Sequence, residues 1–163
     1  AKWNVPAAVY AGCVDTVQLC LSKGLGAPLG SVLCGSADFI AEARHWRKRL
    51  GGGLRQAGIV AAAGIHALTC NLQRLPQDHE NAALLAELLL DAGVPVEPSP
   101  WRTNMVFFAP RQATMTAAEC VVRCESAGVR MLALGERRLR AVTHLDVQRG
   151  DIEAAAQVIT AIA

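Results

Sequence analysis

Residues 19–30 read Leu19-Cys20-Leu21-Ser22-Lys23-Gly24-Leu25-Gly26-Ala27-Pro28-Leu29-Gly30. An apolar run from Val17 to Leu21 ends just before Lys23, and a turn with three glycines and one proline follows. This pattern predicts a buried strand that delivers Lys23 to its edge. A lysine that loses water there favours its neutral amine, which attacks carbonyl groups and forms Schiff bases. A solvated lysine in a tight turn is the alternative interpretation.

The glycines of this turn fit neither of two common nucleotide-binding motifs. No lysine follows them at the phosphate-loop spacing, and Pro28 interrupts any Gly-x-Gly-x-x-Gly pattern. They instead leave the backbone beside Lys23 uncrowded, which gives a flat cofactor room to lie against it.

The composition limits the classes of function. The chain has 163 residues, of which 52% are hydrophobic and 18% charged, and its formal net charge is +2. This length suffices for one good core or two small ones. The small net charge argues against a nucleic-acid partner or a strong attraction to membranes. No apolar run is long enough to span a bilayer, and the first residues lack the layout of a signal peptide, so we expect a soluble, cytoplasmic protein.

The six cysteines show no Cys-x-x-Cys spacing. In a reducing compartment we expect free thiols rather than disulfides. Cys120 and Cys124 share an apolar helix face with Ala117 and Val121, which indicates packing rather than metal binding or redox work. The sequence therefore predicts no metal site.

Up to residue 72, the pattern predicts strands over 17–22 and 31–35 and helices over 37–50 and 54–72. The last helix is so apolar that we expect it to be covered on several sides, either centrally or at a subunit contact. Arg55 falls in its first turn, where backbone N–H groups favour an anion, so Arg55 is a candidate phosphate ligand. An arginine that reaches solvent past the glycine-rich bend is the alternative.

A long helix over 75–92 follows, and from residue 94 short strands alternate with helices. We expect strands over 94–96, 104–109, 129–134 and 139–143, and helices over 116–128 and 151–163. This order suits a small α+β domain with its helices on one face of the sheet. The sequence thus predicts an α/β protein with the end of a large domain over 1–72, a linking helix over 73–93 and a small domain over 94–163.

Arg140 stands inside an apolar strand of that small domain. A lone guanidinium there needs an anion or paired acceptors, because burying an unpaired charge is costly. Asp146 is an internal candidate for that partner, and an external anion is the other.

Five stretches resemble the motifs of one enzyme family. They are Leu21-Ser22-Lys23-Gly24-Leu25-Gly26-Ala27-Pro28, Gly51-Gly52-Gly53-Leu54-Arg55-Gln56-Ala57-Gly58, Asp78-His79-Glu80-Asn81-Ala82, Thr103-Asn104-Met105-Val106-Phe107-Phe108 and Arg140-Ala141-Val142-Thr143-His144-Leu145-Asp146-Val147. The set is similar to the L-threonine aldolases of the low-specificity and L-allo-threonine type. The resemblance implies a lyase with the aspartate-aminotransferase-like fold (pyridoxal phosphate fold type I), of which the chain matches only the carboxy-terminal half.

The resemblance also implies roles for three residues. Lys23 would form the Schiff base with pyridoxal 5'-phosphate (PLP), and Arg55 would reach the cofactor phosphate, often from a neighbouring subunit. Arg140 would bind the carboxylate of a β-hydroxy amino acid. The implied reaction is retro-aldol cleavage of L-threonine or L-allo-threonine to glycine and acetaldehyde, in a homo-oligomer (dimer or tetramer) with shared active sites.

The sequence lacks three parts of the family pattern. It contains no Asp-Gly, so the family's Asp-Gly-Ala-Arg motif is missing, as are the histidine that stacks on the cofactor and the Gly-Thr element that contacts its phosphate. We therefore expect this chain to be inactive by itself. A non-catalytic fragment, an interaction module built on the small domain, and another fold type I PLP lyase stay open as alternatives.

Overall fold

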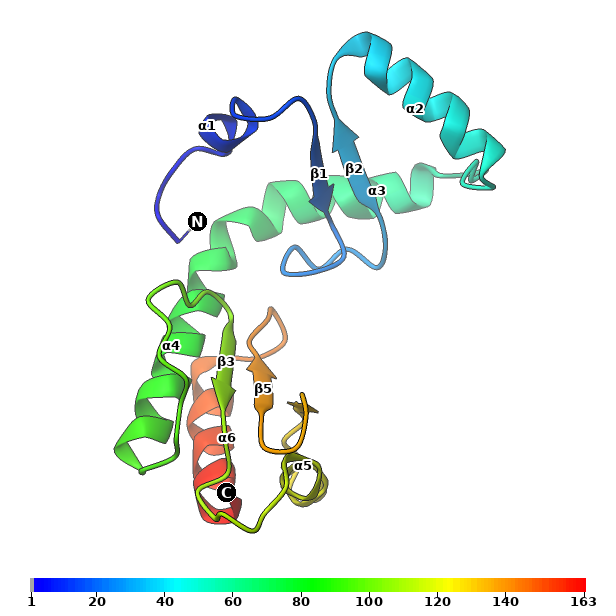
Figure 1. Cartoon of the computed structure of the whole chain (residues 1–163). Coiled ribbons are helices and arrows are strands. Elements are labelled where there is room, and N and C mark those ends of the chain that lie inside the picture. Colours follow the sequence, from blue (N-terminus) through cyan, green and yellow to red (C-terminus); the bar gives the residue numbers. More distant parts are fainter. Residues whose placement is uncertain (1) are drawn as a thin grey trace. The chain divides into compact units, whose positions relative to one another are not determined.

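The computed structural model of the chain describes residues 2–163 and divides into two compact units, Ala1–Leu75 (unit 1) and Pro76–Ala163 (unit 2) (Figure 1). The helix α4 (Leu75–Asp91) begins with the last residue of unit 1 and continues into unit 2. No helix of residues 2–163 is long and apolar enough to cross a membrane.

Unit 1 contains one antiparallel strand pair and a series of helices. The strands β1 (Val17–Cys20) and β2 (Ser31–Cys34) pair with Val17 opposite Cys34 and Cys20 opposite Ser31. The helical elements are α1 (Ala7–Ala11), α2 (Ala37–Arg49), α3 (Gly58–His66), a π-helical turn η1 (Ala67–Asn71) and a 3-10 turn η2 (Leu72–Arg74).

The helix α2 begins where the sequence predicts. The Ser36 hydroxyl accepts a hydrogen bond from the Phe39 backbone N–H at 3.3 Å, which satisfies one of the free N–H groups of the first turn. After Leu50, Gly51 adopts a φ of +84°, a conformation that costs glycine little and ends the helix.

Two expectations for unit 1 are wrong. The strand β1 is not buried, because Gln18 and Leu19 are exposed, as is every residue of β2. The helix expected over 54–72 starts only at Gly58, and no other described part of unit 1 covers its Ile59, which is 82% exposed, so of the two expected forms of coverage only a subunit contact stays open. Both differences have one physical cause: the single strand pair and the helices of unit 1 do not enclose each other, and burial requires a further layer.

Unit 1 has a small buried cluster where the Lys23 region meets the helices. Leu21, Leu25, Ala27 and Ala67 are buried, and Leu75 packs against them. A Cβ at Gly64 would lie 2.9 Å from the Leu21 Cδ1 atom, so glycine at this position allows Leu21 to pack against α3.

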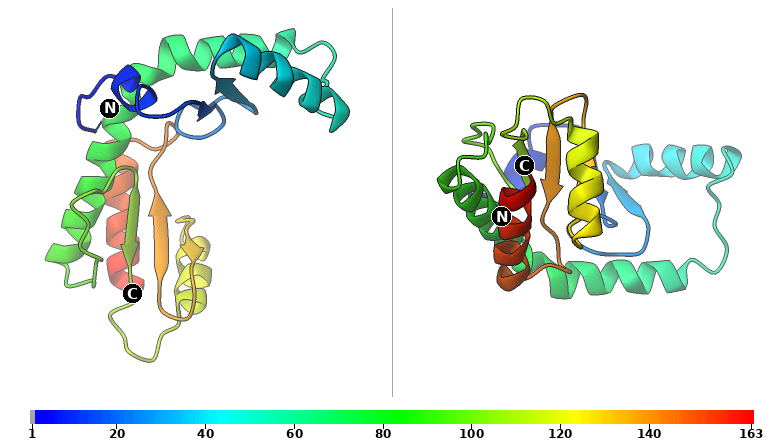
Figure 2. Two further views of the ribbon diagram at one scale, coloured as in Figure 1. Left: turned by 45° about the horizontal axis from the view of Figure 1, so that its top comes forward. Right: turned by 90° about the horizontal axis from the view of Figure 1, so that it is seen from below.

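Unit 2 is a three-stranded antiparallel sheet with helices over one face. The strand β5 (Leu139–Val142) lies between β3 (Met105–Phe108) and β4 (Leu132–Ala133). The helices are α4, α5 (Ala117–Ser126) and α6 (Arg149–Ile162), and the left view of Figure 2 shows α6 (red) behind β3 (light green). Leu89, Phe108, Cys120, Cys124, Leu139 and Ile159 are at most 1% exposed and form the centre of the core.

Local signals in unit 2 are confirmed. Thr116 and Glu119 form the capping box at the start of α5, with the Glu119 carboxylate accepting from the Thr116 N–H at 2.8 Å. The packing of Cys120 and Cys124 in the core is also confirmed. Gly93 and Gly128, which follow α4 and α5, have φ values of +77° and +86°.

The strand expected over 94–96 is reduced to a single bridge between Val96 and Phe108. Pro95 has no backbone N–H to donate to a ladder, and only its carbonyl bonds, accepting from the Ala109 N–H at 2.9 Å. The strand expected over 129–134 likewise shortens to the two residues of β4.

Candidate functional site

Lys23 lies in a tight loop between β1 and β2, which we call the Lys23 loop (residues 21–30). The Lys23 carbonyl accepts a hydrogen bond from the Gly26 N–H at 2.8 Å, and Gly26 has a φ of +73°. The Leu21 carbonyl accepts a hydrogen bond from the Ala27 N–H at 3.0 Å. The Leu21 N–H donates to the Gly30 carbonyl, also at 3.0 Å. These bonds fix the backbone on both sides of Lys23, whose side chain is exposed rather than dehydrated as predicted.

Asn71 ties the Lys23 loop to the helical part of unit 1. Its Nδ2 donates to the Leu25 carbonyl at 2.8 Å, across 46 positions of sequence. Asn71 is the last residue of the π-helical turn η1, and such turns are frequent at functional sites. Asn71 is not predicted from the sequence because its partner is a backbone carbonyl. The one available signal is an amide side chain at the end of a strongly apolar helical run.

Cys20, three residues before Lys23, was also missed. Its Sγ lies 3.5 Å from the Ser22 Oγ. Hydrogen bonding by Ser22 is the main cause that lowers the pKa of the Cys20 thiol, with smaller contributions from Ser31 and the Lys23 charge. The end of β1 therefore favours the thiolate form of Cys20.

Arg55 is not in the first turn of a helix, contrary to the prediction. It lies in the bend before α3, three residues ahead of Gly58, and the next residue, Gln56, has a φ of +51°. The guanidinium is exposed, and in the part of unit 1 that the structure describes no carboxylate pairs with it. No hydrogen bond or ion pair joins it to Lys23 within residues 2–75. Its assignment as a phosphate ligand stays a prediction.

Arg140 occupies the central strand of unit 2, opposite Phe107 of β3 and Leu132 of β4. It lies on the open face of the sheet, since Leu139 and Ala141 are buried under the helices and Val142 is 40% exposed. Its Nε atom is the one buried side-chain N or O atom of residues 2–163 that has no hydrogen-bond partner. Buried donors are nearly always satisfied, so this nitrogen calls for an acceptor.

The internal partner considered for Arg140 is wrong. The Asp146 carboxylate lies 3.3 Å from the His144 Nδ1, and both side chains are largely exposed. Of the two alternatives left by the sequence, an external anion remains.

Arg138 provides the contrast to Arg140. Its guanidinium donates to both oxygens of Glu97, at 2.6 and 2.9 Å, and lies 4.5 Å from the Phe107 ring centre. Hydrogen bonding to Arg138 lowers the pKa of the Glu97 carboxyl, and the same bonds raise the pKa of Arg138. Arg138, just before β5, is thus paired within the chain, whereas Arg140, inside β5, keeps its Nε without an acceptor.

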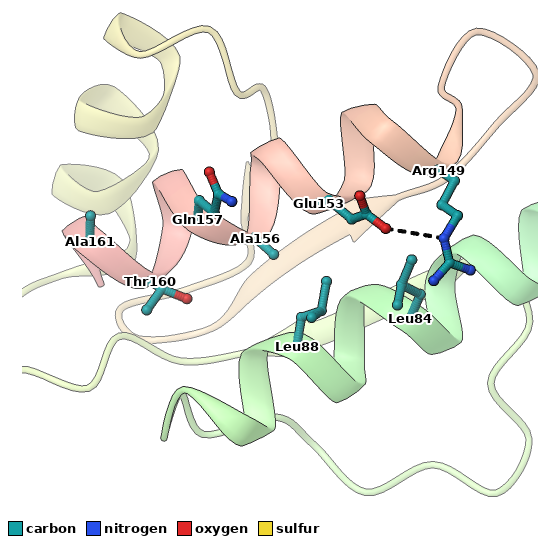
Figure 3. Close-up of a pocket in the computed structure, with 8 residues that line it drawn as sticks. All are labelled: Leu84, Leu88, Arg149, Glu153, Ala156, Gln157, Thr160 and Ala161. Atoms are coloured by element: carbon teal, nitrogen blue, oxygen red, sulfur yellow. Dashed lines mark hydrogen bonds and ion pairs between the residues drawn. The ribbon is translucent and has the colours of Figure 1, made fainter.

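Figure 3 shows a groove of about 570 Å³ between α4 and α6. Leu84 and Leu88 of α4 face α6, and an Arg149–Glu153 ion pair of 3.1 Å lies at one end. The groove contains none of the three predicted site residues and no group of reactive side chains. Within residues 2–163 no cluster of His, Cys, Asp or Glu has the arrangement of a metal site.

Comparison with known proteins gives both a family match and longer relatives. The sequence model described as beta-eliminating lyase matches residues 1–113. The chain is 45% identical over 135 residues to a low specificity L-threonine aldolase of Escherichia coli K12, covering 83% of the chain and 39% of the relative. It is 41% identical over 151 residues to a low-specificity L-threonine aldolase of Arabidopsis thaliana, covering 91% of the chain and 42% of the relative. The chain therefore spans about two fifths of the length of these curated relatives.

Solved structures share the fold. A protein of Listeria monocytogenes EGD-E, assigned as an L-allo-threonine aldolase, superposes with a TM-score of 0.76 at 19% identity. The match covers 99% of the chain and 48% of that structure. The predicted α/β class and PLP fold type I are confirmed.

Proposed function

The chain belongs to the beta-eliminating lyase family, and from that premise we propose that it forms the carboxy-terminal part of a PLP-dependent threonine aldolase. The proposed reaction is the cleavage of L-threonine or L-allo-threonine to glycine and acetaldehyde. The names of the relatives from E. coli and A. thaliana support this choice. The structural observation that carries it is the buried, unpartnered Nε of Arg140.

Arg140 is the proposed ligand of the substrate carboxylate. A guanidinium presents its donors in a planar fork, which matches the two oxygens of a carboxylate. Phe107 and Leu132 flank Arg140 across the sheet, so the arginine works against an apolar surface where a charged hydrogen bond gains strength. The substrate carboxylate would supply the acceptor that no residue of unit 2 supplies.

The residues of unit 1 fit the chemistry of PLP. Lys23 offers an exposed primary amine in a loop whose backbone is fixed, and this amine suits the aldehyde of the cofactor. Arg55 offers an exposed guanidinium, which suits the cofactor phosphate. When bound, PLP supplies an electron-withdrawing ring that stabilises the charge left on Cα as its bond to Cβ breaks. We assign Lys23 to holding the cofactor covalently and Arg55 to holding its phosphate.

The proposed enzyme is a homo-oligomer in which unit 1 is covered. Leu50, Leu54, Ile59 and Ile65 are 63–82% exposed, an apolar surface that soluble proteins rarely leave uncovered. This surface supports the expectation of a dimer or tetramer.

The test joins the amino-terminal part of the E. coli relative to residues 1–163, a protein that we call the reconstituted aldolase. We expect it to release acetaldehyde from L-threonine when PLP is added. Lys23→Ala should abolish the reaction, whereas Lys48→Ala, which removes another lysine of unit 1, should not. Absence of acetaldehyde from the folded protein, or full activity of Lys23→Ala, would contradict the proposal.

A further inference from the structure

Three segments of unit 2 match the family motifs but have no role so far. They are residues 78–82 at the start of α4, residues 103–108 around β3, and residues 143–147 after β5. In the structure these segments meet at the end of β5. Thr143, three residues beyond Arg140, is the point where they connect.

The side chain of Thr143 is 1% exposed and bonds two of the segments. Its hydroxyl donates to the Asp78 carbonyl of α4 at 2.6 Å and lies 3.3 Å from the Asn104 carbonyl. Its backbone N–H donates to the same Asn104 carbonyl at 2.9 Å, and the Asn104 Nδ2 donates back to the Thr143 carbonyl at 3.1 Å. A fourth residue, Asn81, donates from its Nδ2 to the Val147 carbonyl at 3.2 Å.

These bonds extend the β3–β5 ladder by one position. The last regular pair is Met105 with Val142, and the next positions along the two chains are Asn104 and Thr143. At this position the Asn104 amide side chain takes the place of a backbone donor. The end of β5 is therefore fixed along the strand by β3 and across the sheet by α4.

Thr143 and Arg140 lie on opposite faces of the sheet, because side chains alternate along a strand. Thr143 points into the face that the helices cover, while Arg140 lies on the open face. The hydrogen bond from the Thr143 hydroxyl to the Asp78 carbonyl anchors β5 on the covered face. It thus sets the position of the Arg140 guanidinium without contacting the ligand of that guanidinium. Shifting the end of a strand moves every side chain that it carries.

We propose that Thr143 is a positioning residue for Arg140. Its hydroxyl, bonded to the Asp78 carbonyl, holds β5 where the Arg140 guanidinium meets the carboxylate of the amino-acid substrate. The inference rests on the proposed function, in which Arg140 binds that carboxylate. It assigns the motif residues Asp78, Asn104 and Thr143 to one task.

The test compares Thr143→Val, which keeps the shape but removes the hydroxyl, with Thr143→Ser, which keeps the hydroxyl. In the reconstituted aldolase we expect Thr143→Val to raise the KM for L-threonine about tenfold, since small misplacements of a binding group have large effects. The kcat should stay within about twofold, because the group that binds PLP is unchanged. Thr143→Ser should keep the KM within about twofold of the parent. An unchanged KM in a folded Thr143→Val protein, or an equal loss in Thr143→Ser, would overturn the inference.

A matched control separates positioning from stability. Thr116→Val also removes a threonine hydroxyl of unit 2, and it breaks the capping box of α5. It should lower the unfolding midpoint while leaving the KM unchanged. A KM shift in Thr116→Val as large as that in Thr143→Val would mean that destabilisation alone raises the KM, and the inference would fail.

A double variant separates this inference from the proposed function. Arg140→Gln alone should raise the KM, and if it does not, the proposed role of Arg140 fails. Where Arg140→Gln raises the KM, Thr143→Val added to it should change kcat/KM by less than about twofold, because both changes act on one interaction. Independent, multiplying effects would overturn the positioning role only. Should Thr143→Val not fold, Asn104→Ala takes its place, because it removes one hydrogen bond to Thr143 from a half-buried position. A raised KM for L-threonine in Asn104→Ala supports the inference, and an unchanged KM overturns it.

Discussion

Arg140 is the residue at which the proposed function and the stability of the fold oppose each other. A buried donor without a partner costs about 1–3 kcal/mol of folding free energy, which an incoming carboxylate would recover. Arg138, beside the same strand, carries no such cost because Glu97 accepts two of its hydrogen bonds. The pair therefore separates an arginine that the fold satisfies from one whose Nε it leaves without an acceptor.

Replacing Arg140 by methionine should stabilise the unliganded chain. Methionine ends where the Nε of arginine lies, so Arg140→Met removes the unsatisfied donor and keeps the apolar stem, and we expect the free energy of unfolding to rise by about 1 kcal/mol. Urea denaturation of the 163-residue chain measures this change. Arg138→Met is the control and should lower stability, because it leaves Glu97 unpaired. A clear loss of stability in Arg140→Met would show that Arg140 is satisfied in the free chain.

The Glu97–Arg138 pair should make stability depend on pH on the acid side. Arg138 lowers the pKa of Glu97 below its ordinary value of 4.5, so the folded chain binds this proton less readily than the unfolded chain. The resulting stability is present above pH 4.5 and is lost as the pH falls through the lower, folded value. Glu97→Gln should flatten this part of the curve when urea midpoints are compared between pH 6 and pH 3. Parallel curves for the two proteins would contradict the pairing.

Residue roles were predictable only where a side chain conflicts with its local sequence. An arginine in an apolar strand signals a need for an anion, and Arg140 was found in this way. Asn71 and Thr143 give no such signal, because each bonds a backbone carbonyl 46 or 65 positions away. The roles assigned to Lys23, Arg55 and Arg140 stay predictions.

At the scale of elements, the Lys23 loop depends on one long-range bond and a small cluster. Its internal turns fix the local backbone, and within residues 2–163 the Asn71 amide and the packing of Leu21, Leu25 and Ala27 join it to the helices. A loop held at so few points opens readily. The Asn71 hydrogen bond therefore contributes much of the free energy that keeps the Lys23 loop closed against the helices.

Asn71→Ala should loosen this loop without unfolding the chain. We expect amide hydrogen exchange at Gly26 and Ala27, whose N–H groups bond within the loop, to accelerate about fivefold. In the reconstituted aldolase the same change should slow PLP attachment to Lys23. Gln73→Ala is the control, since Gln73 is exposed and lies two residues away. Equal exchange rates in the Asn71→Ala and Gln73→Ala proteins would show that the Asn71 side chain does not hold the Lys23 loop in place.

Element boundaries set by local signals were predicted, and those set by distant contacts were not. Ser36 and the Thr116–Glu119 box start their helices as expected, since a cap acts within four residues. The start of α3 was placed four residues too early, because Gln56 takes a positive φ that its sequence does not announce. The burial of β1 could not be read from its apolar pattern, since burial depends on neighbours and this sheet has two strands.

At the scale of the whole chain, the two units differ in how their apolar residues are used. Unit 2 closes a core from its three helices and the strands β3 and β5, with several large side chains at most 1% exposed. Unit 1 leaves apolar residues of β2, α2 and α3 exposed. The confirmed fold and the span of about two fifths of the relatives give this contrast a simple meaning: unit 1 is the part whose surface the proposed enzyme would cover.

Thiol labelling should distinguish the exposed surface of unit 1 from the closed core of unit 2. In the native chain we expect iodoacetamide to modify the exposed Cys13, Cys34 and Cys70, whereas Cys120 and Cys124 stay protected. Burial also raises the pKa of the Cys124 thiol to about 12, which suppresses its thiolate. Mass spectrometry of the digested protein assigns each site. In the reconstituted aldolase Cys34 of β2 should become slower to react, and rapid labelling of Cys120 in the native chain would contradict the closed core.

The measurement that bears most directly on the account is borohydride reduction of the reconstituted aldolase after PLP is added. Residues 1–163 hold three lysines, Lys2, Lys23 and Lys48, so peptide mapping assigns an adduct in this part of the protein to one of them and separates it from lysines of the amino-terminal part. We predict one phosphopyridoxyl group per chain, carried by Lys23 and absent from the Lys23→Ala protein. An adduct on another residue, or none at all in a protein that still cleaves L-threonine, would contradict the assignment of Lys23 and with it the proposed enzyme.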